Sequence, residues 1–125
     1  MPYYKHNFDN PHFQNKKRIF GLKKLNESGL FDHLSAMKEV KVAILFGSFS
    51  RYDWYNNSDV DIFIYGNDTN FEQGKYELKL KREIQLFTAE NKKDLEKMGE
   101  GLITNIVSGF IIKGSLDDMG VKVCA

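Results

Sequence analysis

Two aspartates separated by one residue, Asp59 and Asp61, have a spacing that suggests chemistry. In a β-strand successive side chains point to opposite faces, so both carboxylates would emerge on one face, about 6–7 Å apart. At an effective dielectric constant of about 20, the two charges repel each other by roughly 2–3 kcal/mol. Because carboxylates are preferred ligands of Mg²⁺, we expect the pair either to lie in water or to bind this cation.

A glycine and a serine, Gly47 and Ser48, follow the apolar segment 42–46, which is predicted to form a strand. A glycine at the end of a strand lets the backbone approach a ligand closely, and a serine in the next turn offers a hydroxyl and an N–H group to an anion. We therefore interpret these two residues as a phosphate-binding turn. Together with the aspartates, this turn would hold a complex of Mg²⁺ and a nucleoside triphosphate, which suggests nucleotidyl transfer.

The residues around the aspartates predict how they are held. Val60, Ile62 and Ile64 form the opposite, apolar face of the same predicted strand and would anchor it to a core. Segment 83–88 also alternates between apolar and polar residues. If this second predicted strand lies beside the first, its residues Glu83 and Gln85 face the carboxylate pair.

The spacing of these residues resembles the signature of a known family. Gly47-Ser48 is followed, after ten residues, by Asp59-Val60-Asp61. This arrangement is similar to the GSx10DxD signature of the minimal nucleotidyltransferases in the DNA polymerase beta-like superfamily. The resemblance extends over residues 40–113. It implies an α/β (α+β) fold of the nucleotidyltransferase type, with a small mixed β-sheet and helices packed mainly on one face.

The resemblance also implies a site. The implied catalytic and metal-binding pair is Asp59 and Asp61, which would hold one or two Mg²⁺ ions. The implied nucleotide-binding residues lie in and directly after the glycine–serine turn: Gly47, Ser48, Ser50 and Arg51.

A third carboxylate, which the family carries on a later strand, is missing from the position that we align with it. Gln85 stands there. An amide neither accepts a proton at neutral pH nor balances the charge of a second cation. Glu83 is on the same predicted face, so we expect either that Glu83 replaces the missing carboxylate or that transfer is slow or absent. We therefore count both Glu83 and Gln85 among the candidate catalytic residues.

The function that the resemblance implies is Mg²⁺-dependent transfer of a nucleoside monophosphate, AMP from ATP, to an acceptor. MNT antitoxins, which belong to this superfamily, pair with HEPN-domain toxins and modify them, so the implied acceptor is a partner protein. A chain of 125 residues is expected to lack a second, acceptor-binding domain, and a partner or a homodimer would then complete the site. The alternative is a nucleotide-binding or regulatory interaction module that has lost transfer chemistry.

Length and composition limit the other possibilities. The length predicts one domain. The sequence pattern divides it into an arm (1–12), N-terminal helices (13–39) and a C-terminal tail (115–125), and the resemblance implies a nucleotidyltransferase core (40–114). The 18 basic and 17 acidic residues give no overall field that would attract nucleic acid or an acidic membrane. A single cysteine excludes an internal disulfide, and no apolar run approaches the length of a membrane span. We expect a cytoplasmic protein.

Overall fold

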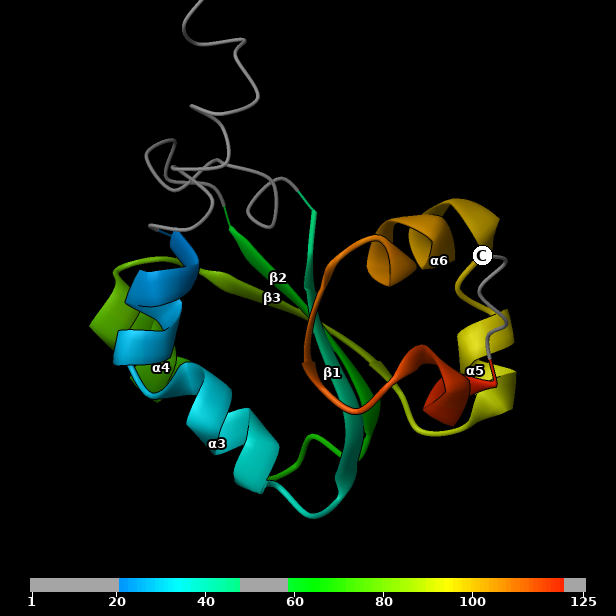
Figure 1. The fold of residues 1–125 in the computed structure, drawn as a ribbon, viewed down its shortest axis with the longest axis horizontal. Helices are drawn as coiled ribbons and strands as arrows, with labels where there is room; N and C mark the ends of the chain where they lie inside the picture. Colours follow the sequence, from blue (N-terminus) through cyan, green and yellow to red (C-terminus); the bar gives the residue numbers. More distant parts are fainter. Residues whose placement is uncertain (1–20, 48–58, 121–125) are drawn as a thin grey trace, which may run out of the picture.

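A mixed four-stranded sheet forms the centre of the computed structural model, which describes residues 21–47 and 59–120 (Figure 1). The strands are β1 (Val40–Phe46), β2 (Val60–Gly66), β3 (Ile84–Ala89) and β4 (Phe110–Lys113). Their order across the sheet is β3-β2-β1-β4. β1 pairs antiparallel with both β2 and β4, whereas β2 and β3 are parallel. The predicted α+β class with a small mixed sheet is therefore confirmed.

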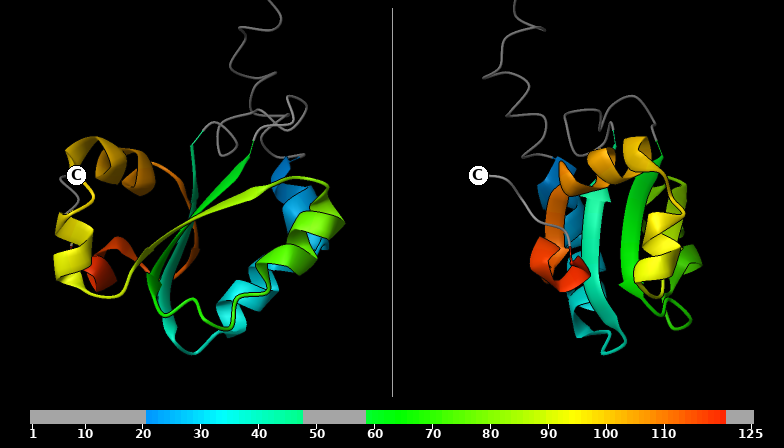
Figure 2. Two further views of the ribbon diagram at one scale, coloured as in Figure 1. Left: turned by 180° about the vertical axis from the view of Figure 1, so that it is seen from behind. Right: turned by 90° about the vertical axis from the view of Figure 1, so that its right-hand side faces the viewer.

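Helices pack against both faces of this sheet (Figure 2). The helical residues 21–27, α3 (Leu30–Ala36) and α4 (Gln73–Leu80) lie over one face. The short α5 (Lys92–Glu96), α6 (Glu100–Val107) and the 3-10 helix η3 (Leu116–Met119) lie over the other. The helices are thus less one-sided than the sequence predicted. The reason is the central strand β1, in which residues 42–46 are all buried, so apolar side chains on both faces need cover.

α4 makes the crossover that the parallel pair β2 and β3 requires, because parallel neighbours cannot be joined by a tight turn. The sequence of residues 71–81 is compatible with a short helix or an extended linker. The structure forms a helix across Gly74, whose surroundings are open. Its buried residues Tyr76 and Leu80 lie one turn apart and face the sheet.

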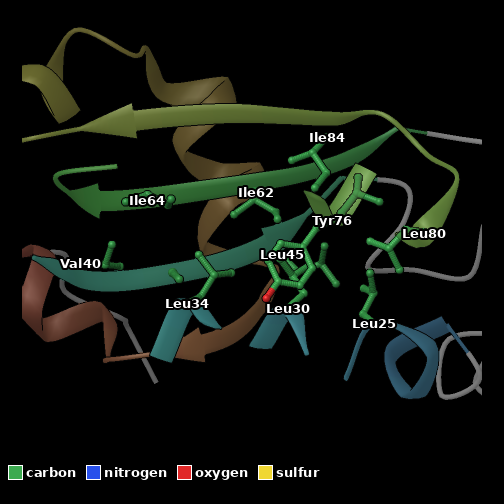
Figure 3. Packing of buried hydrophobic residues seen from close by; sticks show 12 residues of the cluster. Leu25, Leu30, Leu34, Val40, Leu45, Ile62, Ile64, Tyr76, Leu80 and Ile84 are labelled. Carbon is green, nitrogen blue, oxygen red and sulfur yellow. The ribbon is translucent and has the colours of Figure 1, made fainter. Parts of the chain in front are cut away.

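Two clusters of buried side chains make up the core. Figure 3 shows the one under α3 and α4; its buried members are Leu25, Leu30, Leu34, Val40, Ala43, Leu45, Val60, Ile62, Ile64, Tyr76, Leu80 and Ile84. The second cluster, under α5, α6 and η3, consists of Val42, Ile44, Phe46, Phe63, Tyr65, Ala89, Leu95, Ile106 and Met119. The strands alternate between the two clusters, so the sheet separates them.

The ends of the predicted domain plan are described only in part. The arm and residues 13–20 lie outside the described residues. Met119, in the segment predicted as a tail, is only 1% exposed and packs in the second cluster, so residues 116–119 belong to the packed structure. None of the helices within residues 21–47 and 59–120 has the length and apolar character needed to cross a membrane.

The burial of the first cluster can be tested with two leucines in helices. Leu34 is fully buried, whereas Leu78 is 82% exposed. Leu34→Ala leaves a cavity and is expected to lower the free energy of unfolding by about 2–5 kcal/mol. Leu78→Ala is the matched control, with an expected change within about 0.5 kcal/mol. Urea denaturation measures both, and equal losses would contradict the packing described here.

Candidate functional site

Asp61 lies at the end of the sheet where β1 finishes and β2 begins. It is paired with Phe46, the last residue of β1. Because its neighbours Val60 and Ile62 point into the cluster under α3 and α4, Asp61 belongs to the opposite face of β2. Asp59 immediately precedes this strand. Its charge contributes to raising the pKa of Asp61, so the two carboxylates lie within range of an electrostatic interaction.

Gly47 lies directly against the carboxylate of Asp61. Its φ is 76°, a left-handed conformation that favours glycine. A Cβ atom built on Gly47 would collide with the Oδ2 atom of Asp61 and would lie 3.3 Å from its Cγ. The glycine is therefore needed both for the turn and for the close approach. Of the other implied nucleotide-binding residues, Ser48, Ser50 and Arg51 lie outside the described residues.

The carboxylate of Asp61 is in an environment that disfavours its charge. Its Oδ1 atom is buried and has no hydrogen-bond partner among the described residues. Burial, and secondarily the charge of Asp59, raise the pKa of Asp61 above the usual value of 3.8. A cation would compensate both effects, because it would supply an opposite charge and a ligand for the buried oxygen.

The pair offers two carboxylates, which are ligands that suit a divalent cation. Mg²⁺ is usually held by one or two carboxylates together with waters and substrate phosphates, not by a complete cage of protein ligands. Within the described residues no group of three or more His, Cys, Asp or Glu side chains is arranged to hold a metal ion. Among the described residues, Asp59 and Asp61 are therefore two carboxylates that could ligate a divalent cation, without a third such ligand grouped with them.

Gln85 is the direct neighbour of Asp61 on β3. The two residues are paired in the parallel register of β2 and β3, so they lie on the same face of the sheet. Gln85 is exposed. Its amide can donate or accept a hydrogen bond beside the carboxylates but cannot take up a proton. Gln85 therefore lies on the face of Asp61, as the alternation of the sequence predicts.

Glu83 lies immediately before β3, one residue ahead of the partner of Val60. Its backbone carbonyl accepts a hydrogen bond of 2.8 Å from the N–H of Val60. The residue is exposed and borders a pocket of about 600 Å³ against α4, lined also by Gly74, Leu78 and Arg82. The described structure does not group Glu83 with Asp59 and Asp61. Replacement of the third carboxylate by Glu83 is thus without support from this geometry.

Two aromatic rings that the sequence analysis did not single out lie next to the pair. Phe46 and Phe87 meet edge to face, with ring centroids 5.2 Å apart and an interplanar angle of 63°. Phe46 is paired with Asp61, and Phe87 is two residues beyond Gln85 on the same face. These rings provide an apolar border to the site. The alternation of segment 83–88 had already placed Phe87 on this face, so a signal for it was present.

Removing the charge of Asp61 is expected to stabilise the protein in the absence of Mg²⁺. Asp61→Asn removes both the desolvated charge and its repulsion with Asp59, so the melting temperature without Mg²⁺ should rise. The same substitution should abolish any increase of the melting temperature on addition of Mg²⁺ and ATP. Asp32→Asn, at an exposed position of α3, is the control and should change neither quantity. A variant that is destabilised without Mg²⁺ would contradict the assigned electrostatics.

The raised pKa of Asp61 also predicts a pH dependence. A group whose pKa is raised in the folded state binds more protons there than in the unfolded state, so folding gains stability as the pH falls. Wild type should therefore be less stable than Asp61→Asn at neutral pH. The difference should shrink as the pH is lowered through the raised pKa towards 3.8. Urea denaturation of both proteins across this range measures the difference, and a constant difference would contradict the shift.

The protein is similar in structure to solved toxin–antitoxin chains, at low sequence identity. The sequence has no significant match among curated proteins. The structure is similar to a solved toxin–antitoxin with AMP-PNP, at 22% identity over 85% of this chain and 78% of that chain, with a TM-score of 0.49. It is also similar to two substituted forms of the toxin–antitoxin MntA-HpeT. One is 19% identical over 82% of this chain and 77% of that chain, with a TM-score of 0.48. The other is 20% identical over 79% of this chain and 73% of that chain, with a TM-score of 0.43.

A family model shows the relationship at the level of sequence. The model described as polymerase beta, nucleotidyltransferase, matches residues 30–114. The matched range contains the whole four-stranded sheet, Gly47 and both aspartates. The chain therefore belongs to the polymerase beta nucleotidyltransferase family.

Proposed function

We propose that this protein is a Mg²⁺-dependent nucleotidyltransferase that moves AMP from ATP to a side-chain hydroxyl of a partner protein. The observation that carries the proposal is the state of Asp61. Its buried Oδ1 atom has no hydrogen-bond partner among the described residues, its carboxylate lies against Gly47, and the charge of Asp59 repels it. A site of this kind is stabilised when a cation and a phosphate enter together.

In this proposal the protein contributes ligands and a close approach to the backbone. Asp59 and Asp61 would hold one or two Mg²⁺ ions, which would neutralise charge on the α-phosphate and on the leaving pyrophosphate. The missing side chain of Gly47 leaves room for the Asp61 carboxylate, and a glycine at the end of β1 would also let a phosphate approach the backbone. We assign Ser48, Ser50 and Arg51 to nucleotide binding from the family resemblance.

The reaction forms one bond and breaks one. The acceptor oxygen bonds to the α-phosphorus, the bond from this phosphorus to the oxygen that bridges to the β-phosphate breaks, and pyrophosphate leaves. The hydroxyl proton of the acceptor also has to be removed. Gln85, where the family has a carboxylate, cannot accept it, so we propose that the proton passes to water. Transfer without a protein base is expected to be slow.

The resemblance to MNT antitoxins supports a protein acceptor, for which a HEPN-domain protein is our first candidate. A second copy of this chain is the other candidate for completing the site. ATP as the nucleotide and a single cysteine in the sequence both suit the cytoplasm as the compartment.

A second function is favoured by one observation, the position of Gln85 beside Asp61. With an amide there, the site can hold Mg²⁺ and a nucleotide without a base for the transfer step. The protein would then be a nucleotide-binding or regulatory interaction module. The two functions share the metal–nucleotide complex and differ only in turnover.

Incubation with ATP labelled on the α-phosphate, Mg²⁺ and candidate partner proteins tests transfer. Label should appear on the partner with wild type. It should fall by roughly a hundredfold or more with Asp59→Asn, which removes a proposed metal ligand. Asp32→Asn, which keeps both proposed ligands, should transfer label like wild type. Labelling that survives the loss of Asp59 would remove the enzymatic function.

Two separate substitutions, Gln85→Glu and Glu83→Gln, distinguish the enzyme from the binding module. Gln85→Glu restores a carboxylate beside Asp61 and should accelerate transfer by roughly a hundredfold, the lower end of what a general base contributes. Glu83→Gln should leave the rate unchanged, because Glu83 is not grouped with the aspartates. Transfer that is absent from wild type and appears with Gln85→Glu would assign the natural protein to the binding module.

A further inference from the structure

The backbone of Ile84 turns its polar groups away from the rest of the sheet. Val60 donates its N–H to the carbonyl of Glu83 at 2.8 Å. In a parallel pair the residues of a strand alternate between facing the neighbouring strand and facing away from it, so Glu83 and Gln85 face β2. The N–H and carbonyl of Ile84 therefore point to the outer side of β3, the last strand in the described sheet.

Two side chains of α4 bind both of these groups. The Nε2 atom of Gln73 donates to the carbonyl of Ile84 at 2.7 Å. The N–H of Ile84 donates to the Oε2 atom of Glu77 at 2.9 Å. Gln73 and Glu77 are four residues apart in α4 and therefore lie on one side of the helix. Together they take the place that the backbone of an adjacent strand would have.

Glu77 also organises the turn from α4 into β3. Its backbone carbonyl accepts hydrogen bonds from the N–H groups of Lys81 and Arg82. Lys81 has a φ of 55°, the one positive φ outside glycine in the described residues, and this conformation reverses the chain at the end of the helix. Glu77 thus holds the connection at two points, by its carbonyl and by its carboxylate.

Ile84, whose backbone is bound by Gln73 and Glu77, lies directly beside the site. Ile84 is paired with Val60, which lies between the two aspartates, and it is followed by Gln85, the neighbour of Asp61. Ile84 itself is 4% exposed and packs with the buried face of α4. A shift of β3 by one residue would move Gln85 to the other face of the sheet. The bonds to Ile84 oppose such a shift at the point nearest to the aspartates.

We propose that Gln73 and Glu77 are positioning residues of the nucleotide site. They act through Ile84, whose fixed backbone keeps Gln85 beside Asp61 and keeps the start of β2 in place. The inference rests on the proposed function for its link to nucleotide binding. The hydrogen bonds and the register themselves do not depend on that function.

Two variants of Glu77 and one control test this proposal in the full chain. Glu77→Ala removes the acceptor, whereas Glu77→Gln retains an oxygen that can accept the N–H of Ile84. Glu96→Ala removes an exposed glutamate of α5 on the other face of the sheet. The dissociation constant for ATP in the presence of Mg²⁺ is measured by calorimetry, well below the melting temperature of every variant.

Glu77→Ala is expected to weaken this binding by roughly tenfold or more, as is typical when a group that orients the residues of a metal site is lost. Glu77→Gln should bind within roughly threefold of wild type, since it keeps the hydrogen bond, and Glu96→Ala should bind like wild type. A merely structural role would lower the melting temperature of Glu77→Ala and leave the binding unchanged, and that result would overturn the proposal. Equal losses with Glu77→Ala and Glu77→Gln would overturn it as well.

Amide hydrogen exchange gives a second measurement that needs no nucleotide. The N–H of Val60, which donates to the carbonyl of Glu83 just before β3, should lose protection in Glu77→Ala, whereas amides between β1 and β2 should keep theirs. Protection of Val60 should return in Glu77→Gln. Uniform loss along the sheet would overturn the positioning role. If wild type fails to bind ATP with Mg²⁺, the proposed function fails, and the exchange pattern alone then decides whether Gln73 and Glu77 hold the register.

Discussion

The site depends on a carboxylate, that of Asp61, whose charge is disfavoured by burial and by the charge of Asp59. The carboxylate is partly buried, it faces the like charge of Asp59, and Gly47 closes one side of it. Such an arrangement persists only where the surrounding structure is stable enough to impose it. Here β2 is buried on the face under α3 and α4 and is held between β1 and β3. The core therefore supports a pair of charges that would separate on a less rigid element.

Much of this site could be predicted from local periodicity. Alternation along β2 and β3 is a property of strands that does not depend on their neighbours, so the faces of Asp61 and Gln85 followed from sequence. The spacing from Gly47 to the aspartates indicated the family, and the match of the family model over residues 30–114 confirms it. These features are local in the chain or common to a family, and both kinds of information are present in a single sequence.

Other features depend on contacts between segments that are distant in the chain, so they could not be predicted from the sequence. Nothing in the spacing of Gln73 and Glu77 indicates that their side chains bind the backbone of Ile84. The helix α4, which contains Gly74, serves as the crossover between the parallel strands β2 and β3, and this parallel pairing is a property of the assembled sheet. The division of the helices between two faces likewise follows from the burial of β1 on both sides, a property of the assembled sheet.

The binding of the outward backbone groups of Ile84 by α4 has a consequence for solubility. Unpaired backbone groups on an edge strand can pair with a strand from another molecule and begin aggregation. At Ile84 both groups are already bound by α4, so a foreign strand would first have to displace two side chains. The contacts that hold this end of β3 thus also protect it from intermolecular pairing.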